Sequence, residues 1–599
     1  MPAAFADFLQ GHLGTVEPLF LKSALTWWSL HTTGKEEYAK EAERLSKEIQ
    51  GVYASGEDYR LVKEWWDNAR PTDALLRRQL QLLRIEYTCG QKPAEDIEAL
   101  AKLETEVNQL YTNFRGVVGG KELSNNELND ILKKSDDMAL RKEAWEASKQ
   151  IGQLAEAKVR ELAHLRNRIA KRIGFEDHFA LAMFANEIDE KQLFDLLNDL
   201  KEKTDPVWKE LKGGLDAELA KRFKVKPEEL RSWHYADPFF QEVPPLTGID
   251  LDPLFTEASL EDLTTRTYDS LGMDIRDILL RSDLYERPGK DQHAFCTHID
   301  RKGDIRVLCN VRKDARWMET MLHEFGHAVY DKYTDMTLPY FLRGPAHSLT
   351  TEAIAILFGN LAENPDWLRE FAGVSRERLA TLSGPLAQRL RLSRLIFLRW
   401  ALVVVSFERE MYRNPDRELN QLWWDLVERF QWVKRPEGRN APDYAAKIHV
   451  ALVPCYYQNY ILGNLMASQV LAHARAKLGG FVRNAAAGRF LIDRVFRPGA
   501  TMPWNELIAH ATGTPLRPDA WVSEVKGAKG STQAAPAKAA PKKAAKAKKP
   551  ATKRPVAKKA APKKLKAKKP VARKTKAVKR AAPKKTRRQL ARVGGKRRK

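Results

Sequence analysis

The sequence has few cysteines and no long apolar run. Only four cysteines occur in 599 residues, and no two of them form a CxxC pair. This usage excludes a disulfide framework and fits a reducing compartment. The most apolar segment, residues 395–407 (LIFLRWALVVVSF), is too short to cross a membrane and contains Arg399. We therefore expect no membrane span, and we expect residues 395–407 to form a buried helix.

A secretion signal is also lacking at the N-terminus. The first twenty residues, MPAAFADFLQGHLGTVEPLF, contain no basic stretch followed by an apolar core. The hydrophobic fraction of 43% is nevertheless sufficient for a packed interior. These features predict a soluble protein in the cytoplasm.

Acidic residues are absent from the C-terminal tail. Residues 526–599 contain 31 lysines and arginines and no aspartate or glutamate. Of the 102 basic and 78 acidic residues in the whole chain, 71 basic and all 78 acidic residues therefore lie in residues 1–525. The tail is rich in lysine, alanine and proline and has almost nothing to bury, so it should be disordered. We predict one folded domain over residues 1–525 and a disordered basic tail over residues 526–599.

The charge of the tail indicates a polyanionic partner. Release of counterions would make it bind DNA or RNA without sequence preference, tightly at low salt and weakly at high salt. No aromatic residues interrupt the tail, so base stacking is not expected. Its composition resembles the C-terminal tails of linker histones and bacterial histone-like proteins, which implies association with the nucleoid. A solubility tail and a contact with anionic lipid are the alternatives.

The body of the chain is patterned mainly for helices. Segments such as residues 34–53 (GKEEYAKEAERLSKEIQGVY) place apolar residues three and four positions apart among charged ones. The clearest strand signal is residues 293–311 (HAFCTHIDRKGDIRVLCNV), in which two β-rich runs flank a turn at Gly303. The sequence therefore predicts a mainly α fold with one small hairpin.

A metal-binding pattern follows this hairpin directly. Residues 323–327 read HEFGH, so His323 and His327 lie on one face of a helix and can direct ring nitrogens to one ion. Glu324 is about 100° further around the helix axis, where it can act as a base beside the ion. The alternative is an amphipathic helix with a partly buried histidine pair.

A catalytic zinc ion needs a third protein ligand and an open position. Downstream, Thr350 or Thr351 could cap a second helix whose first turn presents Glu352. Twenty-four residues separate His327 from Glu352, enough for the first helix to end and a second one to cross it. We predict Glu352 as the third ligand, with His347 and His298 as competitors. Two imidazoles and one carboxylate suit zinc best.

These motifs resemble the angiotensin-converting-enzyme (peptidyl-dipeptidase A) family. The resemblance is carried by HEFGH followed after 24 residues by TEAIA, and by the pair His293 and Ala294 thirty residues upstream. It implies a helical gluzincin with two lobes, a deep central cleft, a small β-sheet at the cleft edge and one zinc ion per chain. It also implies that His293 and Ala294 hold an extended substrate along the strand edge.

Further resemblance is found in residues 443–460 (DYAAKIHVALVPCYYQNY), which are similar to a Lys-x-His and Pro-Tyr-x-x-Tyr segment of that family. By this match, Lys447 and Tyr457 grip the C-terminal carboxylate of the substrate. His449 and Tyr460 donate hydrogen bonds to the reacting carbonyl and its oxyanion. The match requires a one-residue deletion, so Tyr456 and Tyr457 could exchange roles. The alternative is a tyrosine-rich core helix.

Three positions depart from the family pattern. Ile356 stands where the family often has an aspartate that orients the first histidine, so another partner is expected. Asn459 replaces an arginine that holds chloride in the animal enzymes, so we do not expect chloride activation. No counterpart is evident for a glutamine that helps to bind the terminal carboxylate, and Tyr235 is the nearest substitute.

The expected function is zinc-dependent hydrolysis of short peptides with release of C-terminal dipeptides. An oligoendopeptidase of the thimet oligopeptidase or oligoendopeptidase F type is the alternative, because those families share HEFGH and a late His/Tyr segment. A second class of alternative is a nucleoid-associated binding protein whose peptidase-like body is inactive. The intact HExxH motif and Glu352 argue against an inactive body.

Overall fold

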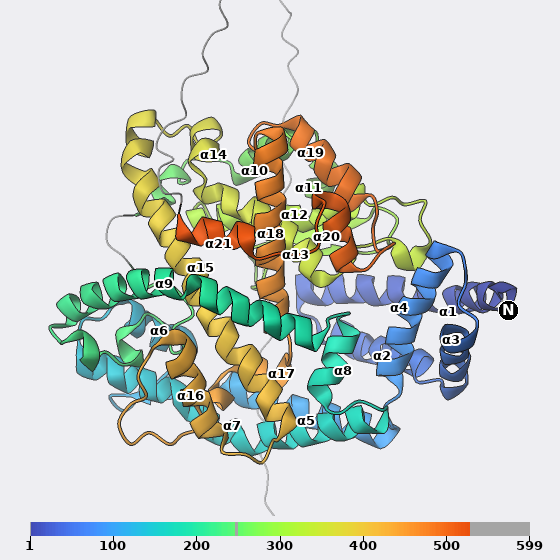
Figure 1. Ribbon diagram of the computed structural model, residues 1–599, viewed down its shortest axis with the longest axis horizontal. Coiled ribbons are helices and arrows are strands. Elements are labelled where there is room, and N and C mark those ends of the chain that lie inside the picture. The colour runs from blue at the N-terminus through green and yellow to red at the C-terminus, as the bar shows by residue number, and fades with distance from the viewer. Residues whose placement is uncertain (1, 246–248, 528–599) are drawn as a thin grey trace, which may run out of the picture. The chain divides into compact units, whose positions relative to one another are not determined.

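The computed structural model describes residues 2–245 and 249–527 (Figure 1). The predicted disordered tail lies outside the described residues from position 528 onward. Residue 526 still belongs to a helix, so the predicted boundary at 525 falls within the last helix of the described chain. None of the described helices combines the length and the apolarity that a bilayer crossing requires.

Helices make up most of the described chain, as predicted. The α-helices are α1 (Pro2–Thr33), α2 (Glu36–Tyr53), α3 (Gly56–Asn68), α4 (Ala74–Gly90), α5 (Ala94–Asn113), α6 (Asn125–Lys134), α7 (Met138–Arg172), α8 (His178–Ala185), α9 (Glu190–Phe223), α10 (Leu260–Asp269), α11 (Arg276–Arg281), α12 (Ala315–Tyr333), α13 (Ser348–Gly359), α14 (Pro365–Glu370), α15 (Arg376–Arg413), α16 (Leu419–Gln431), α17 (Ile448–Leu452), α18 (Tyr457–Leu478), α19 (Ala485–Leu491), α20 (Trp504–Thr512) and α21 (Asp519–Lys526). The shorter 3-10 helices are η1 (Pro227–Glu229), η2 (Ser232–His234), η3 (Asp252–Leu254), η4 (Tyr340–Leu342), η5 (Asn360–Glu363) and η6 (Asp443–Ala446), and η7 (Ile492–Phe496) is a π-helix.

Two short antiparallel hairpins complete the described fold. One pairs β1 (Gly116–Val118) with β2 (Lys121–Leu123). The other pairs β3 (Phe295–His298) with β4 (Ile305–Leu308), with Phe295 opposite Leu308. This second hairpin confirms the one predicted from residues 293–311, and Gly303 in its turn has a φ of 121°, which favours glycine. The sequence did not suggest the first hairpin.

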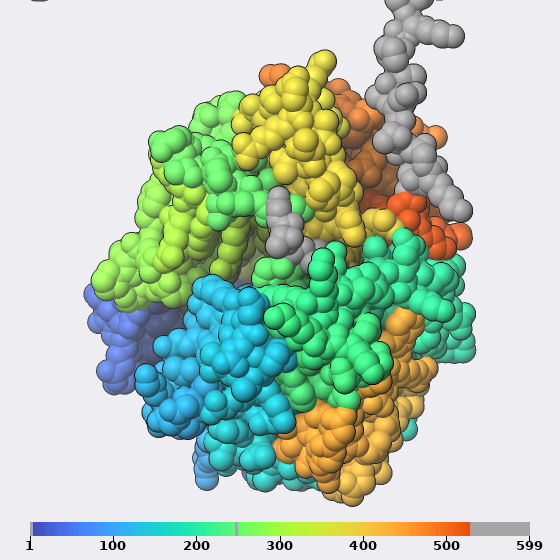
Figure 2. Space-filling view, turned by 90° about the vertical axis from the view of Figure 1, so that its left-hand side faces the viewer, coloured from blue at the N-terminus to red at the C-terminus, as the bar shows by residue number. Residues whose placement is uncertain are grey.

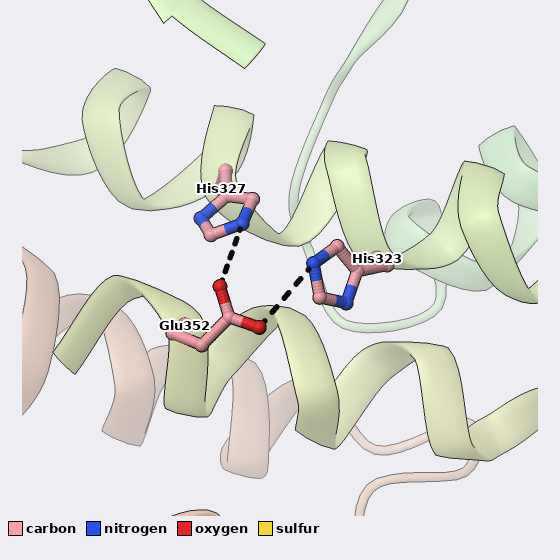
Figure 3. A group of neighbouring side chains, drawn as sticks. All are labelled: His323, His327 and Glu352. Carbon is pink, nitrogen blue, oxygen red and sulfur yellow. Dashed lines mark ion pairs between the residues drawn. The ribbon is translucent and has the colours of Figure 1, made fainter. Parts of the chain in front are cut away.

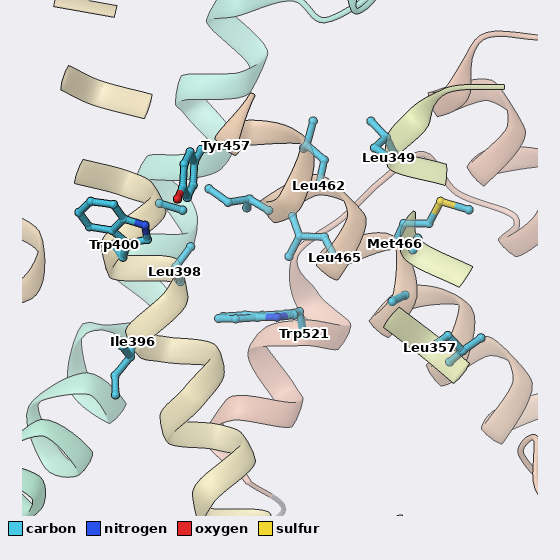
Figure 4. Close-up of a cluster of buried hydrophobic side chains, with 14 of the residues drawn as sticks. Leu349, Leu357, Ile396, Leu398, Trp400, Tyr457, Leu462, Leu465, Met466 and Trp521 are labelled. Atoms are coloured by element: carbon cyan, nitrogen blue, oxygen red, sulfur yellow. The ribbon is translucent and has the colours of Figure 1, made fainter. Parts of the chain in front are cut away.

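The main hydrophobic core joins helices that are far apart in the sequence. Residues 395–407 lie within α15 and are almost all buried, which confirms the buried helix predicted there. Arg399 is fully buried in this helix and donates a 2.6 Å hydrogen bond to Asp205 on α9. Side chains of α13, α15, α18 and α21 gather in one cluster that includes Trp400, Leu465 and Trp521 (Figure 4). This cluster fixes α13 and α18, which carry predicted site residues.

A smaller core forms among the N-terminal helices. Phe5 and Leu9 of α1 pack with Tyr53, Trp65 and Tyr87 of α2, α3 and α4. These helices lie beside the part of the fold that carries α12 and α13 (Figure 1). In the space-filling view the surface is hollowed between the yellow-green and yellow segments above and the cyan and blue-green segments below (Figure 2). This recess agrees with the central cleft expected from the resemblance.

Candidate metal centre and active site

Helix α12 presents the HExxH residues on one side because its other side is apolar. Asp314 caps its N-terminus by accepting a 2.8 Å hydrogen bond from the backbone N–H of Trp317. Met318, Leu322, Phe325 and Val329 recur at helical spacing and are fully buried. The histidines are therefore directed away from the core, toward α13.

Two glycines allow α13 to approach closely enough to complete the site. A Cβ atom on Gly326, inside the HEFGH motif, would lie 2.9 Å from the Cα atom of Ala355 on α13. On the far side of α13, a Cβ atom on Gly463 of α18 would lie 3.3 Å from the carbonyl oxygen of Leu349. Since the helices meet at these positions, α13 carries Glu352 directly to the histidine pair.

Three predicted ligands converge on one point. His323, His327 and Glu352 each offer a ligand atom, and these atoms all lie within 4.8 Å of one another. Each histidine Nε2 is 3.7 Å from a different carboxylate oxygen of Glu352 (Figure 3). Two imidazoles and one carboxylate at these separations fit a zinc ion with an open position.

The two competing histidines have other partners. His347 adopts an extended conformation and caps α13, its Nδ1 accepting a 3.0 Å hydrogen bond from the backbone N–H of Leu349. The expectation that Thr350 or Thr351 caps this helix was therefore wrong, because α13 begins at Ser348. His298 Nε2 accepts a 3.0 Å hydrogen bond from the N–H of Gly303 in the hairpin turn.

A hydroxyl group orients one of the histidines. Nδ1 of His327 is 2.7 Å from Oγ1 of Thr351, the residue before Glu352. With the ring proton on Nδ1, the nitrogen that faces Glu352 keeps a free electron pair for a metal. Ile356, at the position where the family often has an aspartate, lines a cavity beside Glu352, and the expected alternative partner of His323 stays a prediction.

Burial shifts the pKa values of these side chains in the directions that suit binding of a cation. It lowers the pKa of His323 to about 4 and that of His327 to about 3, so both rings are neutral. It raises the pKa of Glu352 to about 7. Glu324 is 7% exposed, and its pKa rises to about 8 through burial and the neighbouring charge of Glu352. A divalent cation would favour the ionised form of both carboxyl groups.

One of the two predicted oxyanion donors, Tyr460, lies near the same carboxylate. Tyr460 lines the cavity that Glu352 lines, and burial, with the charges of Tyr456 and Glu352, raises its pKa to about 12. The ring centroids of Tyr456 and Tyr460 are 5.0 Å apart, and burial together with the charge of Glu352 raises the pKa of Tyr456. Burial and then Lys447 lower the pKa of His449 to about 4, and its buried Nδ1 has no partner among the described residues. Both tyrosines and this neutral histidine can donate hydrogen bonds at neutral pH.

The predicted carboxylate grip forms a separate group. Lys447 Nζ donates a 2.9 Å hydrogen bond to Oε1 of Gln241 and lies 5.9 Å from the ring centroid of Tyr457. Tyr457 is nearly buried and also contacts His449, with 5.3 Å between ring centroids. Tyr457 therefore lies beside Lys447, and Tyr456 lies near Glu352. Which of the two tyrosines contacts the substrate carboxylate stays a prediction.

Gln241 is a site residue that the sequence did not reveal. The substitute suggested from the sequence, Tyr235, is buried, and its hydroxyl bonds to Lys212 and Asp216 at 2.8 and 2.9 Å. Gln241 instead lies on the irregular segment before residue 245, with its side chain on Lys447. The only signal was a glutamine in a proline-rich connection, which carries no periodicity.

His293 and Ala294 precede the strand that they were expected to extend. β3 begins at Phe295, and the side chain of His293 is 93% exposed. Its Nδ1 lies 3.2 Å from Oδ1 of Asp291. The structure thus places this pair directly before the first strand of the hairpin.

A cavity of about 640 Å³ adjoins the predicted metal site. Glu352, Tyr460 and Gln241 all line it, so it runs from the metal ligands toward the partner of Lys447. Its remaining wall is largely apolar and includes Phe397, Leu465 and Trp521. A peptide chain can therefore extend from the metal site into this space.

Comparison with known proteins identifies two peptidase families. The model of peptidase family M3 matches residues 131–527, which contain the whole site. The model of angiotensin-converting enzyme matches residues 3–232. Angiotensin-converting enzyme of Mus musculus is 21% identical over 556 residues, which cover 85% of this chain and 41% of that protein. The Rattus norvegicus enzyme is 21% identical over 554 residues, with the same shares.

The chain thus spans about two fifths of the length of these curated relatives. The M3 match, in contrast, covers 397 of the 599 residues and includes HEFGH and Glu352. On this evidence the chain belongs to peptidase family M3 and is similar to angiotensin-converting enzyme.

Proposed function

We propose that this protein hydrolyses short peptides and releases dipeptides from their C-termini. The observation that carries the proposal is the position of Lys447. Lys447 is 9% exposed, and its ammonium group donates a hydrogen bond to Gln241, a residue that lines the same cavity as Glu352. A buried ammonium group at this place requires an anion, and the terminal carboxylate of a peptide supplies one.

His323, His327 and Glu352 would hold the zinc ion. Zinc bound there supplies a Lewis acid for the scissile carbonyl and acidifies an attacking water. Glu324 accepts the proton of that water at its carboxylate and later delivers it to the leaving amine. Its near-complete burial prevents bulk water from competing for that proton.

Tyr460 and His449 would stabilise the charge that develops on the carbonyl oxygen. Both are neutral at pH 7, as their shifted pKa values require, and both can donate a hydrogen bond. One such preorganised donor is worth about 3 kcal/mol in the transition state. Tyr456, beside Tyr460, is the alternative donor.

One peptide in two chemical forms tests the proposal. The wild-type protein and the Glu324→Gln variant are loaded with zinc and given a ten-residue peptide as the free acid and as the C-terminal amide. We expect wild type to release dipeptides from the free acid and to release them much more slowly from the amide. The rate of cleavage by Glu324→Gln should be at least about 1000-fold lower than that of wild type. Equal activity of Glu324→Gln and wild type would refute the mechanism.

A second candidate is an oligoendopeptidase, which the match to family M3 supports. Such an enzyme cuts internal bonds and does not require a free carboxylate. Mass spectrometry of the products distinguishes the two, because internal cleavage of acid and amide at equal rates excludes the carboxylate grip.

The basic tail would add a binding function. We propose nonspecific association of residues 526–599 with DNA or RNA, supported by 31 positive charges without one acidic residue. In this proposal the tail tethers an active peptidase to a nucleic acid.

A further inference from the structure

Residues 237–241, which end at Gln241, the hydrogen-bond partner of Lys447, form a turn that is held by several hydrogen bonds. Asp237 is 3% exposed, and its carboxylate accepts hydrogen bonds from the backbone N–H groups of Phe239 at 2.9 Å and Gln241 at 3.0 Å. Gln431 donates to the carbonyl oxygens of Phe239 and Phe240 at 3.0 and 2.8 Å. These bonds fix the position of the Phe239 ring and of the Gln241 side chain.

The ammonium groups of two nearly buried lysines lie close to the Phe239 ring. Lys149 Nζ, from α7, is 3.3 Å from the ring centroid, and Lys447 Nζ is 5.4 Å from the same centroid. The two nitrogens therefore lie within 8.7 Å of each other, the sum of these distances. Lys149 is only 4% exposed, and its ammonium group contacts the Phe239 ring.

The nearby carboxylates are already engaged elsewhere. Asp443 accepts hydrogen bonds from Arg439 at 2.6 Å and from Trp424 at 3.0 Å, and Asp237 accepts the backbone donors of its turn. Burial lowers the pKa of Lys149 to about 7, with Asp443 and Asp237 opposing this shift and Arg439 and Lys447 adding to it. Glu242 also opposes the lowering of the pKa of Lys447, and it pairs with Lys133 at 2.8 Å. The carboxylates near Phe239 thus all have partners besides Lys149 and Lys447.

We propose that Lys149 is a positioning residue of the carboxylate subsite. It places a second positive charge beside the Phe239 ring, and this charge favours substrates with a free C-terminal carboxylate. This inference rests on the proposed function of Lys447 and deepens it. Lys149 touches the ring and not the substrate. The positive charge of Lys149 attracts the substrate carboxylate across the apolar Phe239 ring, where the dielectric constant is low. The contact of Lys149 with this ring also fixes the ring beside Lys447.

The KM of the free-acid peptide should depend on pH if Lys149 has this role. The positive form of Lys149 favours an anionic substrate, so a bound carboxylate raises the affinity of Lys149 for its proton. As the pH rises from 6 to 8, Lys149 loses that proton and the KM of the free acid increases. The amide peptide carries no terminal charge, so its KM lacks this increase.

The experiment compares KM for the free-acid and amide forms of one peptide at pH 6.5. Zinc-loaded wild type, Lys149→Met and Lys149→Arg are measured, with Lys171→Met, an exposed position on the same helix, as the matched control. We expect the acid-to-amide KM ratio to rise about tenfold in Lys149→Met, because one positive charge near the bound carboxylate is lost. Lys149→Arg and Lys171→Met should retain the wild-type ratio.

The possible outcomes separate this inference from the proposed function. If wild type itself does not distinguish acid from amide, the carboxylate grip fails. If wild type distinguishes them and Lys149→Met does so equally well, the role of Lys149 is refuted. Should Lys149→Met not fold, the KM ratios of wild type and Lys149→Arg between pH 6 and 8 decide. The pKa of Lys447 is lowered to about 8 by burial, so Lys447 titrates in both proteins, whereas position 149 titrates only in wild type. Parallel pH profiles of the two proteins would refute the proposal.

Discussion

The hydroxyl of Thr351 lies 2.7 Å from Nδ1 of His327 and orients that ring toward Glu352. Thr351 directly precedes Glu352 in α13, so one helical turn supplies both a predicted ligand and the partner of another. This arrangement couples the geometry of the two ligands, because any shift of α13 moves both contacts together.

Replacing Thr351 by valine tests this contact. Valine keeps the shape of threonine but removes the acceptor, which leaves the ring proton of His327 unpaired and its orientation free. We expect zinc affinity to fall about 10- to 100-fold. Competition with a chromophoric chelator measures this directly. Thr351→Ser retains a hydroxyl group and should bind zinc within a few-fold of wild type, whereas equally weak binding by both variants would contradict the role of the hydroxyl.

The close packing of α12 on α13 at Gly326 leads to a second prediction. An alanine Cβ atom there would lie 2.9 Å from the Cα atom of Ala355, so the helices must separate. We expect Gly326→Ala to lose about 1 to 3 kcal/mol of unfolding free energy and to retain less zinc after dialysis.

Gly213 provides the matched control, because it lies in α9, is exposed, and has nothing within 4 Å of its Cβ position. Gly213→Ala should stabilise the protein by up to about 1 kcal/mol through helix propensity. If both variants were stabilised alike, the contact at Gly326 would not constrain the site.

Much of the metal site could be predicted because its rules are local. The four-residue spacing of His323 and His327 fixes their common face in any α-helix, and the hairpin before α12 has an unambiguous turn. Glu352 required only that a second helix cross the first.

Other site residues depend on tertiary contacts that leave no pattern in the sequence. Gln241 belongs to an irregular segment whose course is set by the buried carboxylate of Asp237. Lys149 lies in a charged helix, where it could not be told from a surface lysine. Thr351 was expected as a possible helix cap, but His347 occupies that position and leaves the hydroxyl for His327.

The basic tail yields a prediction from charge alone. Full-length protein should bind random-sequence double-stranded DNA, and affinity should fall by at least about 100-fold between 50 and 200 mM salt. A variant that lacks residues 528–599 should lose this binding and keep its peptide cleavage. Fluorescence anisotropy measures the binding. A tail with glutamine at every lysine and arginine controls for length, and DNA binding by that variant would refute the electrostatic explanation.

A buried glutamate in α15 should make stability depend on pH. Glu408 is 1% exposed, and its Oε1 accepts a 2.9 Å hydrogen bond from the N–H of Cys455. Its Oε2 has no partner among the described residues. Burial raises its pKa from an ordinary value of 4.5 to about 8. The folded protein therefore holds a proton on Glu408 at pH values where the unfolded chain has lost it.

The sign follows from this difference in bound protons. Below about pH 4.5 both states are protonated and Glu408 carries no penalty. As the pH rises toward 8, ionisation favours only the unfolded chain, so the contribution of Glu408 to stability is progressively lost. Glu408→Gln keeps an acceptor for Cys455 and cannot ionise. We expect it to match wild type near pH 4.5 and to be about 2 to 4 kcal/mol more stable near pH 7.5.

Urea unfolding at several pH values, at equal zinc loading, measures the difference. Glu410 is a half-buried residue of the same helix that pairs with Arg417, and Glu410→Gln should show the pH dependence of wild type. A constant offset between Glu408→Gln and wild type would show that Glu408 is ionised in the folded protein.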